Sequence, residues 1–287
     1  MIKILKRWIS ATIITFTLAS AVLTIGCSIL APTFLSKCKL VKGPIYMEGI
    51  TKNASGLTYD KITDSLYVVI NKPAQIVQLS TDGKFIRKIQ LLGFSDLEGI
   101  ALISQNKFAV VEEANAVLHY IDINRDTATV SINDVSKSVK IDNPQIMVLK
   151  KKNKNKLQTN GIEALGYNPE TRTMLTAKEK KPQKLYTVSL DTINQPFPAN
   201  EAWPVKHLGL GDISGVSILP KLKHILLLSD KSSKIVETSL NGKILDTLEL
   251  RYNESLIQDA EGITVDSKGN IYVCAEPNSL YVFRKVE

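Results

Sequence analysis

The chain has 287 residues, 36 Lys and Arg against 28 Asp and Glu, and a formal net charge of +8. Its three cysteines and three histidines show no CxxC, HxH or HExxH spacing, which argues against a zinc site and a Cys–His nucleophile. No basic-and-aromatic motif accompanies the charge, so no nucleic-acid partner is expected. Sites that bind hard cations through oxygen ligands stay compatible with this composition.

The N-terminal region begins with Lys3, Lys6 and Arg7 and continues as an uncharged run from Trp8 to Ser36. A secretory signal needs an apolar core of only ~7–15 residues, whereas a membrane span needs ~20. The run therefore predicts a retained transmembrane helix within residues 1–36. The basic flank predicts that the N-terminus stays in the cytoplasm and the remainder is exported.

Cys27 supports a second interpretation of the same segment. Leu23-Thr24-Ile25-Gly26-Cys27 resembles a bacterial lipobox, in which Cys27 would be lipidated and become the new N-terminus. Gly26 fits this motif, but Thr24 stands where a large aliphatic residue is usual. A cleaved soluble form is the third alternative. All three place the globular part in the bacterial cell envelope, in the periplasm, with the inner membrane as partner if the helix is retained.

Residues 37–51 are a linker that contains a strand-like segment, Leu40–Met47, and residues 52–287 carry repeats. Five times a polar residue is followed by a small residue, an aliphatic residue and a strand. These first-ring positions are Ser55, Glu98, Glu163, Ser214 and Glu261. At near-constant spacing, a second strand ends at the second-ring positions Asn71, Glu113, Glu179, Asp230 and Glu276. Constant spacing in repeats of unequal length indicates one supersecondary unit used five times.

The first repeat shows what this unit is. Its strands are predicted at Gly56–Asp60, Ser65–Ile70, Gln75–Leu79 and Phe85–Ile89, with an Asp-Gly hairpin turn before the fourth. Four antiparallel strands per repeat are typical of a β-propeller blade, so the fold class is an all-β propeller.

The ends of the repeat array predict how the ring closes. The last repeat supplies only three strands, and Leu40–Met47 is predicted to pair as its outer strand, which removes an exposed edge. Five blades are expected. Six are the alternative, because the second repeat is long enough for an insertion or a degenerate extra blade.

In a propeller the innermost strands line the central channel, and antiparallel pairing places both rings at the same mouth. Seven carboxylates would meet there, and their repulsion requires protons, cationic side chains or a bound cation. Ca²⁺ takes ~6–8 oxygen ligands, including those of Asn and Ser, so the ten ring positions are the predicted calcium ligands. Alternatively, each Glu bonds only the backbone of the next blade. Lys72, Lys180 and Lys231 beside the second ring could neutralise acids or hold phosphate oxygens.

The repeat motifs resemble the SdiA-regulated (YjiK-like) family of bacterial β-propeller proteins. The resemblance rests on five short segments: Asp96–Ile100, Val110–Glu113, Leu228–Asp230, Asp259–Ile263 and Ala275–Asn278. It implies an envelope-associated propeller, phytase-like in fold, with an N-terminal membrane segment, a central metal site and a link to calcium. Two departures bear on that site: Ala164 replaces the glycine of the other copies, and Lys178 is an unusual neighbour of the second ring.

These observations predict a membrane-anchored propeller that binds a divalent cation in a sensing, scaffolding or ion-homeostasis role. The partner beyond the cation, a protein or a small molecule, is not specified by the sequence. Neither ring isolates a nucleophile or a general acid, so binding is favoured over catalysis. The alternatives are a calcium-dependent phosphoesterase and a metal-free protein-interaction platform.

Overall fold

The computed structural model describes residues 33–113, 115–142, 161–178, 183–190 and 197–286. The compact unit of interest spans Thr33–Glu287. Most of the predicted transmembrane segment lies outside the described residues, and so do Cys27, Glu179 and Lys180. Within the described part of the chain, no helix is long and apolar enough to cross a membrane.

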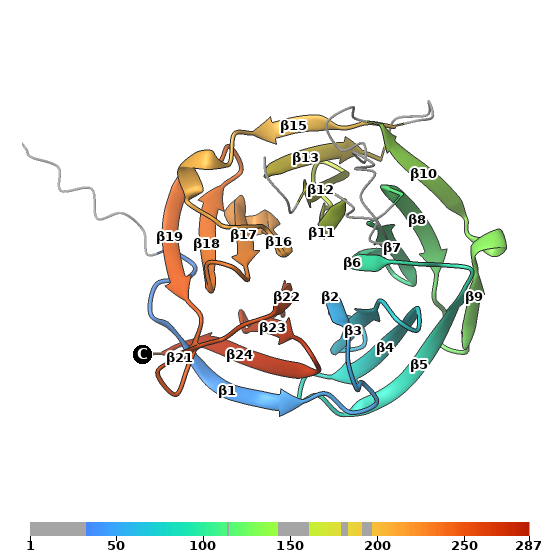
Figure 1. Cartoon of the computed structure of the whole chain (residues 1–287), viewed down its shortest axis with the longest axis horizontal. Helices are drawn as coiled ribbons and strands as arrows, with labels where there is room; N and C mark the ends of the chain where they lie inside the picture. Colours follow the sequence, from blue (N-terminus) through green and yellow to red (C-terminus); the bar gives the residue numbers. More distant parts are fainter. Residues whose placement is uncertain (1–32, 114, 143–160, 179–182, 191–196, 287) are drawn as a thin grey trace, which may run out of the picture. The chain divides into compact units, whose positions relative to one another are not determined.

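Five sheets surround a common axis and form a five-bladed β-propeller (Figure 1). Blade 1 contains β2 (Ala54–Asp60), β3 (Ser65–Ile70), β4 (Gln75–Ser80) and β5 (Phe85–Leu92). Blade 2 contains β6 (Leu97–Ser104), β7 (Lys107–Glu112), β8 (Val117–Asp122) and β10 (Lys137–Asp142). Blade 3 contains β11 (Ile162–Asn168), β12 (Thr173–Lys178), β13 (Lys184–Ser189) and β15 (Asn200–Trp203). The predicted blade plan is therefore confirmed.

Blade 4 contains β16 (Gly215–Leu219), β17 (His224–Ser229), β18 (Lys234–Ser239) and β19 (Ile244–Glu249). Blade 5 contains β22 (Ala260–Val265), β23 (Ile271–Ala275), β24 (Ser279–Lys285) and β1 (Cys38–Tyr46). Three short 3₁₀ turns and a small hairpin, β20 (Arg251–Tyr252) with β21 (Ser255–Leu256), lie outside these five sheets.

The ring closes as predicted, through a strand from the other end of the chain. β1 pairs antiparallel with β24, with Cys38 opposite Lys285 and Tyr46 opposite Ser279. The strand begins and ends slightly earlier than the predicted Leu40–Met47. Because an N-terminal strand completes the C-terminal blade, separating the first and last blades would require breaking its hydrogen bonds.

The long second repeat does not add a sixth blade among the described residues. Its extra length supplies β9 (Thr129–Ser131), which pairs parallel with β5 of blade 1. It also includes β10, whose far edge pairs parallel with β14 (Phe197–Pro198). β9 therefore covers the outer edge of blade 1, and β14, which comes from the third repeat, covers that of blade 2; covering an edge prevents it from pairing with another chain.

The apolar core is divided among the seams between neighbouring blades. Each of five buried clusters combines side chains from two adjacent blades. β3 is buried at every position because blades cover both of its faces, whereas the outer strand β19 alternates between exposed and half-buried residues. This burial pattern explains why the second strand of each blade is mostly apolar in sequence.

The small residue after each first-ring position allows the innermost strands to approach closely. A Cβ on Gly99 would lie 2.7 Å from the Glu163 carbonyl oxygen, and one on Gly262 would lie 2.8 Å from the Leu57 nitrogen. Blade 3 carries Ala164 at this position, buried at the seam. The predicted departure at Ala164 is therefore accommodated within the ring.

Candidate functional site

The first-ring residues lie where the innermost strands are irregular. The register of β6 with β7 shifts between Leu97 and Gly99, and that of β22 with β23 shifts between Ala260 and Gly262. β11 has the same shift around Glu163. A β-bulge changes the direction in which a side chain points, which explains how Glu98, Glu163 and Glu261 turn toward the axis.

The second-ring residues follow the second strand of each blade at the same end of the channel. Leu97 pairs with Glu112, and Ala260 pairs with Ala275, so Glu113 and Glu276 emerge beside Glu98 and Glu261. The two rings therefore meet at one end, the mouth face, as antiparallel pairing predicts. Glu179 of blade 3 belongs to the segment that the structure does not describe.

A third set of polar residues, two positions before the first ring, also reaches this end. Asn53 and Asp212 line the central cavity, and Asp96 lies beside Glu98. Asn53 and Asp96 have positive φ, of 60° and 54°, which short polar side chains tolerate better than most. Sequence analysis did not assign these residues, although a recurrent Asn or Asp two residues before the first ring was a usable signal.

The backbone of the third set contributes to holding the mouth in shape. The Glu113 N–H donates to the Asp96 carbonyl oxygen at 2.8 Å, and the Glu276 N–H donates to that of Asp259 at 2.9 Å. A weaker equivalent joins Asn71 to Asn53 at 3.3 Å. Each bond ties the end of a second strand to the residue that precedes the bulge, and so fixes where the ring side chains begin.

A polar cavity of about 430 Å³ occupies the mouth. It is lined by Asn53, Ser55, Asn71, Lys72, Glu98, Glu163, Asp212, Ser214, Asp230, Glu261 and Glu276. Eight of the ten predicted ring residues thus share one opening. Next to it lies a separate, nearly filled cavity of about 10 Å³, at a layer where each blade contributes one aliphatic side chain, among them Leu57, Val216 and Ile263. This apolar layer forms the floor of the mouth.

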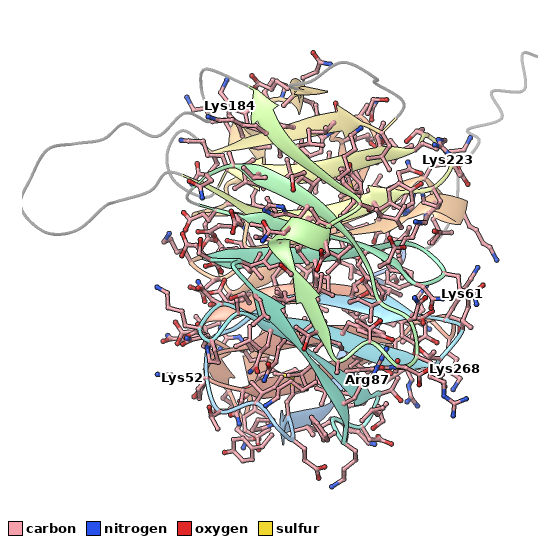
Figure 2. The ribbon with its side chains drawn as sticks, turned by 90° about the vertical axis from the view of Figure 1, so that its right-hand side faces the viewer. Lys52, Lys61, Arg87, Lys184, Lys223 and Lys268 are labelled. Atoms are coloured by element: carbon pink, nitrogen blue, oxygen red, sulfur yellow. The ribbon has the colours of Figure 1, made fainter. Side chains whose placement is uncertain are left out.

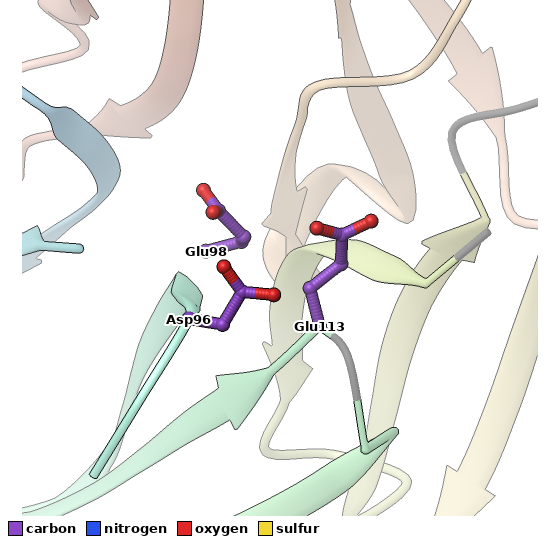
Figure 3. Close-up of side chains that lie close together, drawn as sticks. All are labelled: Asp96, Glu98 and Glu113. Carbon is purple, nitrogen blue, oxygen red and sulfur yellow. The ribbon is translucent and has the colours of Figure 1, made fainter. Parts of the chain in front are cut away.

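Glu113 does not line this cavity but belongs to a tight acidic group on blade 2. Carboxylate oxygens of Asp96, Glu98 and Glu113 all lie within 4.8 Å of one another (Figure 3). The Gly161 N–H donates to Glu113 Oε1 at 3.2 Å. Asn71 Nδ2 donates to Glu98, and its Oδ1 is buried with no hydrogen-bond partner among the described residues. The side-chain amide of Asn71 therefore lies against this group of carboxylates, through its nitrogen.

Electrostatics at the mouth favour protonated acids or a compensating positive charge. Burial raises the pKa of Glu98 to about 7, repulsion from Glu113 and Asp96 adds to this, and hydrogen bonds from Ser55 and Asn71 oppose it. Burial raises the pKa of Glu261 to about 8, with further repulsion from Glu98 and Asp230. The pKa values of Asp230 and Glu276 are also raised, chiefly by burial.

Some polar groups at the mouth have structural partners, as the alternative of backbone bonding predicts. Ser214 Oγ donates to the Ala260 carbonyl at 2.6 Å, and Asp230 accepts the Ala260 N–H at 3.2 Å. Asp212 accepts from Ser229 and from the Lys231 N–H. The bonds to Ala260 join blade 4 to blade 5, so at this seam the ring residues also hold blades together, whereas those of Asp212 lie within blade 4.

The lysines near the second ring have different surroundings. Lys231 Nζ lies 3.7 Å from Asp212 Oδ2, which makes it a partner of one acid. Lys72 is exposed and lines the cavity. Lys178 is buried, its pKa is lowered by desolvation, and it is not among the residues that line the cavity. The departure noted at Lys178 therefore does not place its side chain in the lining of the cavity.

Comparison with known proteins agrees with the fold. The family model described as SdiA-regulated matches residues 36–284. A chain of a nidogen/laminin complex is similar at a TM-score of 0.50 and 14% identity, covering 78% of this chain and 73% of that one. Glutaminyl cyclase from Myxococcus xanthus is similar at a TM-score of 0.59 and 12% identity, covering 86% of this chain and 95% of that one. A luciferin-regenerating enzyme is similar at a TM-score of 0.50 and 12% identity, covering 84% of this chain and 95% of that one. At these identities the solved structures support the fold alone.

Proposed function

The chain belongs to the SdiA-regulated family, and from this premise we propose that its propeller binds a divalent cation, Ca²⁺, at the mouth. The observation that carries the proposal is the polar cavity of about 430 Å³, lined by carboxylates from blades 2 to 5. Every side chain that could donate to a cation there offers oxygen. Among the described residues, no Cys or His lines the cavity, so the donor set suits a hard cation better than zinc or copper.

The residues proposed to hold the cation are those that converge on the cavity. Glu98 and Glu261 are central, because burial disfavours their negative charge and a bound cation would restore it. The unpartnered Oδ1 of Asn71 is a further oxygen of the kind that Ca²⁺ accepts. When bound, the cation supplies positive charge. The chain's own acids supply a fixed concave set of donors above an apolar floor.

We also infer the cellular setting from the N-terminal sequence. The basic flank and the uncharged run from Trp8 to Ser36 support an inner-membrane anchor with the propeller in the periplasm, and lipidation at Cys27 is the competing route. In that setting a cation-binding propeller fits a sensing, scaffolding or ion-homeostasis role. Mass spectrometry of the N-terminus of the purified protein distinguishes a retained helix from a lipidated Cys27.

Thermal unfolding of the full chain tests the cation site directly. At 100 times its Kd, a ligand that binds only the folded state stabilises it by about 2.7 kcal/mol. Adding Ca²⁺ to chelator-treated protein is expected to raise Tm, and Glu98→Gln and Glu261→Gln are expected to abolish most of the rise. Glu249→Gln, which removes an exposed carboxylate paired with Arg251, is the matched control. An unchanged wild-type Tm at millimolar calcium would refute the proposal.

A catalytic alternative keeps one supporting observation, because exposed Lys72 lines the same cavity as the acids. A cation and a lysine together could hold a phosphate ester. Calcium-dependent release of phosphate from a phosphomonoester panel, lost in Glu98→Gln and reduced in Lys72→Ala, would favour the phosphoesterase. Calcium stabilisation without turnover favours the binding function.

A further inference from the structure

The end of the propeller away from the mouth forms a second distinctive surface. The first strand of each blade starts at the mouth, so the turn that joins it to the second strand lies on the far end, the opposite face. By the same antiparallel reasoning, the turns between third and fourth strands also lie there. In blades 1, 4 and 5 these are residues 61–64, 81–84, 220–223, 240–243 and 266–270.

These turns carry exposed lysines. Lys61, Lys221, Lys223 and Lys268 lie on the turns nearest the axis, and Lys84 and Lys243 lie on the outer ones; all six are exposed. Figure 2 shows Lys61, Lys223 and Lys268 along one side of the propeller, with Lys52 and Lys184 on the other side. The same turns also carry Asp64, Asp82 and Asp266, and two of the lysines have acidic partners: Lys84 pairs with Glu48 at 2.6 Å, and Lys268 Nζ lies 4.0 Å from Asp64. The positive charge of the opposite face therefore comes chiefly from Lys61, Lys221, Lys223 and Lys243.

Exposed aliphatic and aromatic side chains stand directly beside these lysines. Ile62 is 57% exposed next to Lys61, and Leu222 is 48% exposed between Lys221 and Lys223. Of the ten large apolar side chains exposed in the described part of the chain, six lie on or next to these turns: Ile62, Phe85, Ile86, Leu222, Leu240 and Ile244. Side chains that are both apolar and flanked by lysine on one face are typical of proteins that bind the interface of a membrane.

The described chain also enters the propeller on this face. The Phe34 and Leu35 N–H groups donate to the two carboxylate oxygens of Glu237, both at 2.9 Å, and Leu35 is buried in the core between blades 4 and 5. Glu237 also contacts His224, the first residue of β17, which begins at the opposite face. Residues 33–38 are thus held at the same end as the lysines.

We propose that this basic apolar face, defined by Lys61, Ile62, Lys221, Leu222, Lys223 and Lys268, rests on an anionic lipid bilayer. Each lysine near an anionic membrane strengthens attraction about five-fold. Ile62 and Leu222 bury apolar surface at the boundary between head groups and acyl chains. The mouth then opens away from the bilayer, so its ligand arrives from the aqueous phase. The proposal rests on charge and exposure at this face and does not require a cation at the mouth.

Site-specific fluorescence on the full chain tests this placement. Cys38 and Cys274 are buried, so in a Cys27→Ser background a dye can be attached at Leu222→Cys, or at Leu92→Cys as control. Leu92 is also exposed, at 52%, but ends β5 near the mouth. In phosphatidylglycerol vesicles carrying quencher lipids, the dye at 222 is expected to be quenched and the dye at 92 is not. Pure phosphatidylcholine vesicles should give little quenching at either position.

Charge reversal provides the second arm. Lys61→Glu with Lys221→Glu is expected to weaken attraction to the anionic vesicle by at least about 25-fold and to remove the quenching at 222. Lys52→Glu with Lys184→Glu, on the other side in Figure 2, should leave it intact. Equal quenching at 222 and 92, or equal quenching in both lipids, would overturn the proposal. Binding to a soluble polyanion that displaces the vesicles and is unchanged by Ile62→Ser would assign the face to a polyanion instead.

The readouts keep this inference separate from the cation site. Flotation of the vesicles reports whether the chain associates with lipid at all, and the pair of dyes reports which face does so. A calcium shift in Tm with no quenching at position 222 would retain the mouth and reject the membrane face. Quenching at position 222 without a calcium shift in Tm would retain the membrane face and reject the cation site.

Discussion

Buried carboxylates at the two ends of the propeller have contrasting surroundings. Near the opposite face, Glu237 is fully buried and receives two backbone N–H bonds and a 2.6 Å contact from His224 Nδ1. At the mouth, Glu98 and Glu261 face other acids, and burial raises their pKa values. A buried acid surrounded by hydrogen-bond donors stabilises the folded state, whereas ionised acids that surround one another repel and destabilise it. We therefore expect an added cation to stabilise the mouth and not the surroundings of Glu237.

The largest expected effect is near the opposite face, at Glu237. Glu237→Ala leaves the Phe34 and Leu35 N–H groups without their acceptor and removes the partner of His224, so we expect the free energy of unfolding to fall by about 3–5 kcal/mol. Urea unfolding measures it. Glu249→Ala, an exposed acid on neighbouring β19, is the control. A loss comparable to that of the control would show that Glu237 does not hold this segment.

At the mouth, removing a carboxylate is expected to raise the free energy of unfolding. The pKa of Glu261 is raised from 4.5 to about 8 in the folded protein. The unfolded state therefore loses this proton first, and wild-type stability falls as pH rises from about 4.5 to about 8. With chelator present, Glu261→Gln should gain on the order of 2 kcal/mol at pH 8 and progressively less toward pH 5.

Urea unfolding of Glu261→Gln across this pH range is the measurement. Glu249→Gln serves again as control: its pKa is lowered, by a hydrogen bond from Arg251, so its contribution does not change between pH 5 and 8. If the stability of Glu261→Gln depended on pH as steeply as that of the wild type, repulsion at Glu261 would not be the cause of the pH dependence.

The mouth was largely predictable because it is built by repetition. Five equivalent positions in one repeated unit must superpose around an axis, which is why Glu98, Glu163 and Glu261 could be placed together before any coordinates. The closing strand followed from a strand missing at the other terminus. Asn53 and Asp212 were not predicted because they precede the innermost strands, although they occupy equivalent positions two residues before the first ring.

The surroundings of Glu237 near the opposite face were not predictable, because they depend on contacts between distant parts of the chain. In the sequence, Glu237 is one of several polar positions in a short strand and resembles an exposed residue. Its burial results from Phe34 and Leu35, about two hundred residues earlier, folding over blade 4. No repeat contains this contact, so no pattern within the repeats indicates it. A non-repeating contact of this kind emerges only from tertiary structure.

A third experiment compares seams of the inner ring. A Cβ on Gly99 would meet the Glu163 carbonyl oxygen at 2.7 Å and Leu165 Cβ at 2.9 Å, so Gly99→Ala must displace the strand that carries Glu163. We expect a loss of about 1–3 kcal/mol. Ala164→Gly makes the reverse change in blade 3 and should cost about 1 kcal/mol, through lost burial and added chain entropy. Urea unfolding measures both changes. If Gly99→Ala left the free energy of unfolding unchanged, the seam between blades 2 and 3 would accommodate a Cβ without cost.

The smallest effect is expected at an exposed ion pair, which sharpens the contrast with Glu237. Lys42 Nζ on β1 lies 2.7 Å from Asp82 Oδ1 in the turn before β5, with both side chains more than half exposed. The hydrogen bond from Lys42 lowers the pKa of Asp82, so the pair contributes above about pH 4 and is lost as the pH falls through that lowered value. Lys42→Ala should cost only about 0.2–1 kcal/mol, and less in ~1 M salt, which screens exposed charges. A loss as large as that of Glu237→Ala, or one unchanged by salt, would mean that closure of blade 5 depends on surface charge rather than on strand pairing and burial.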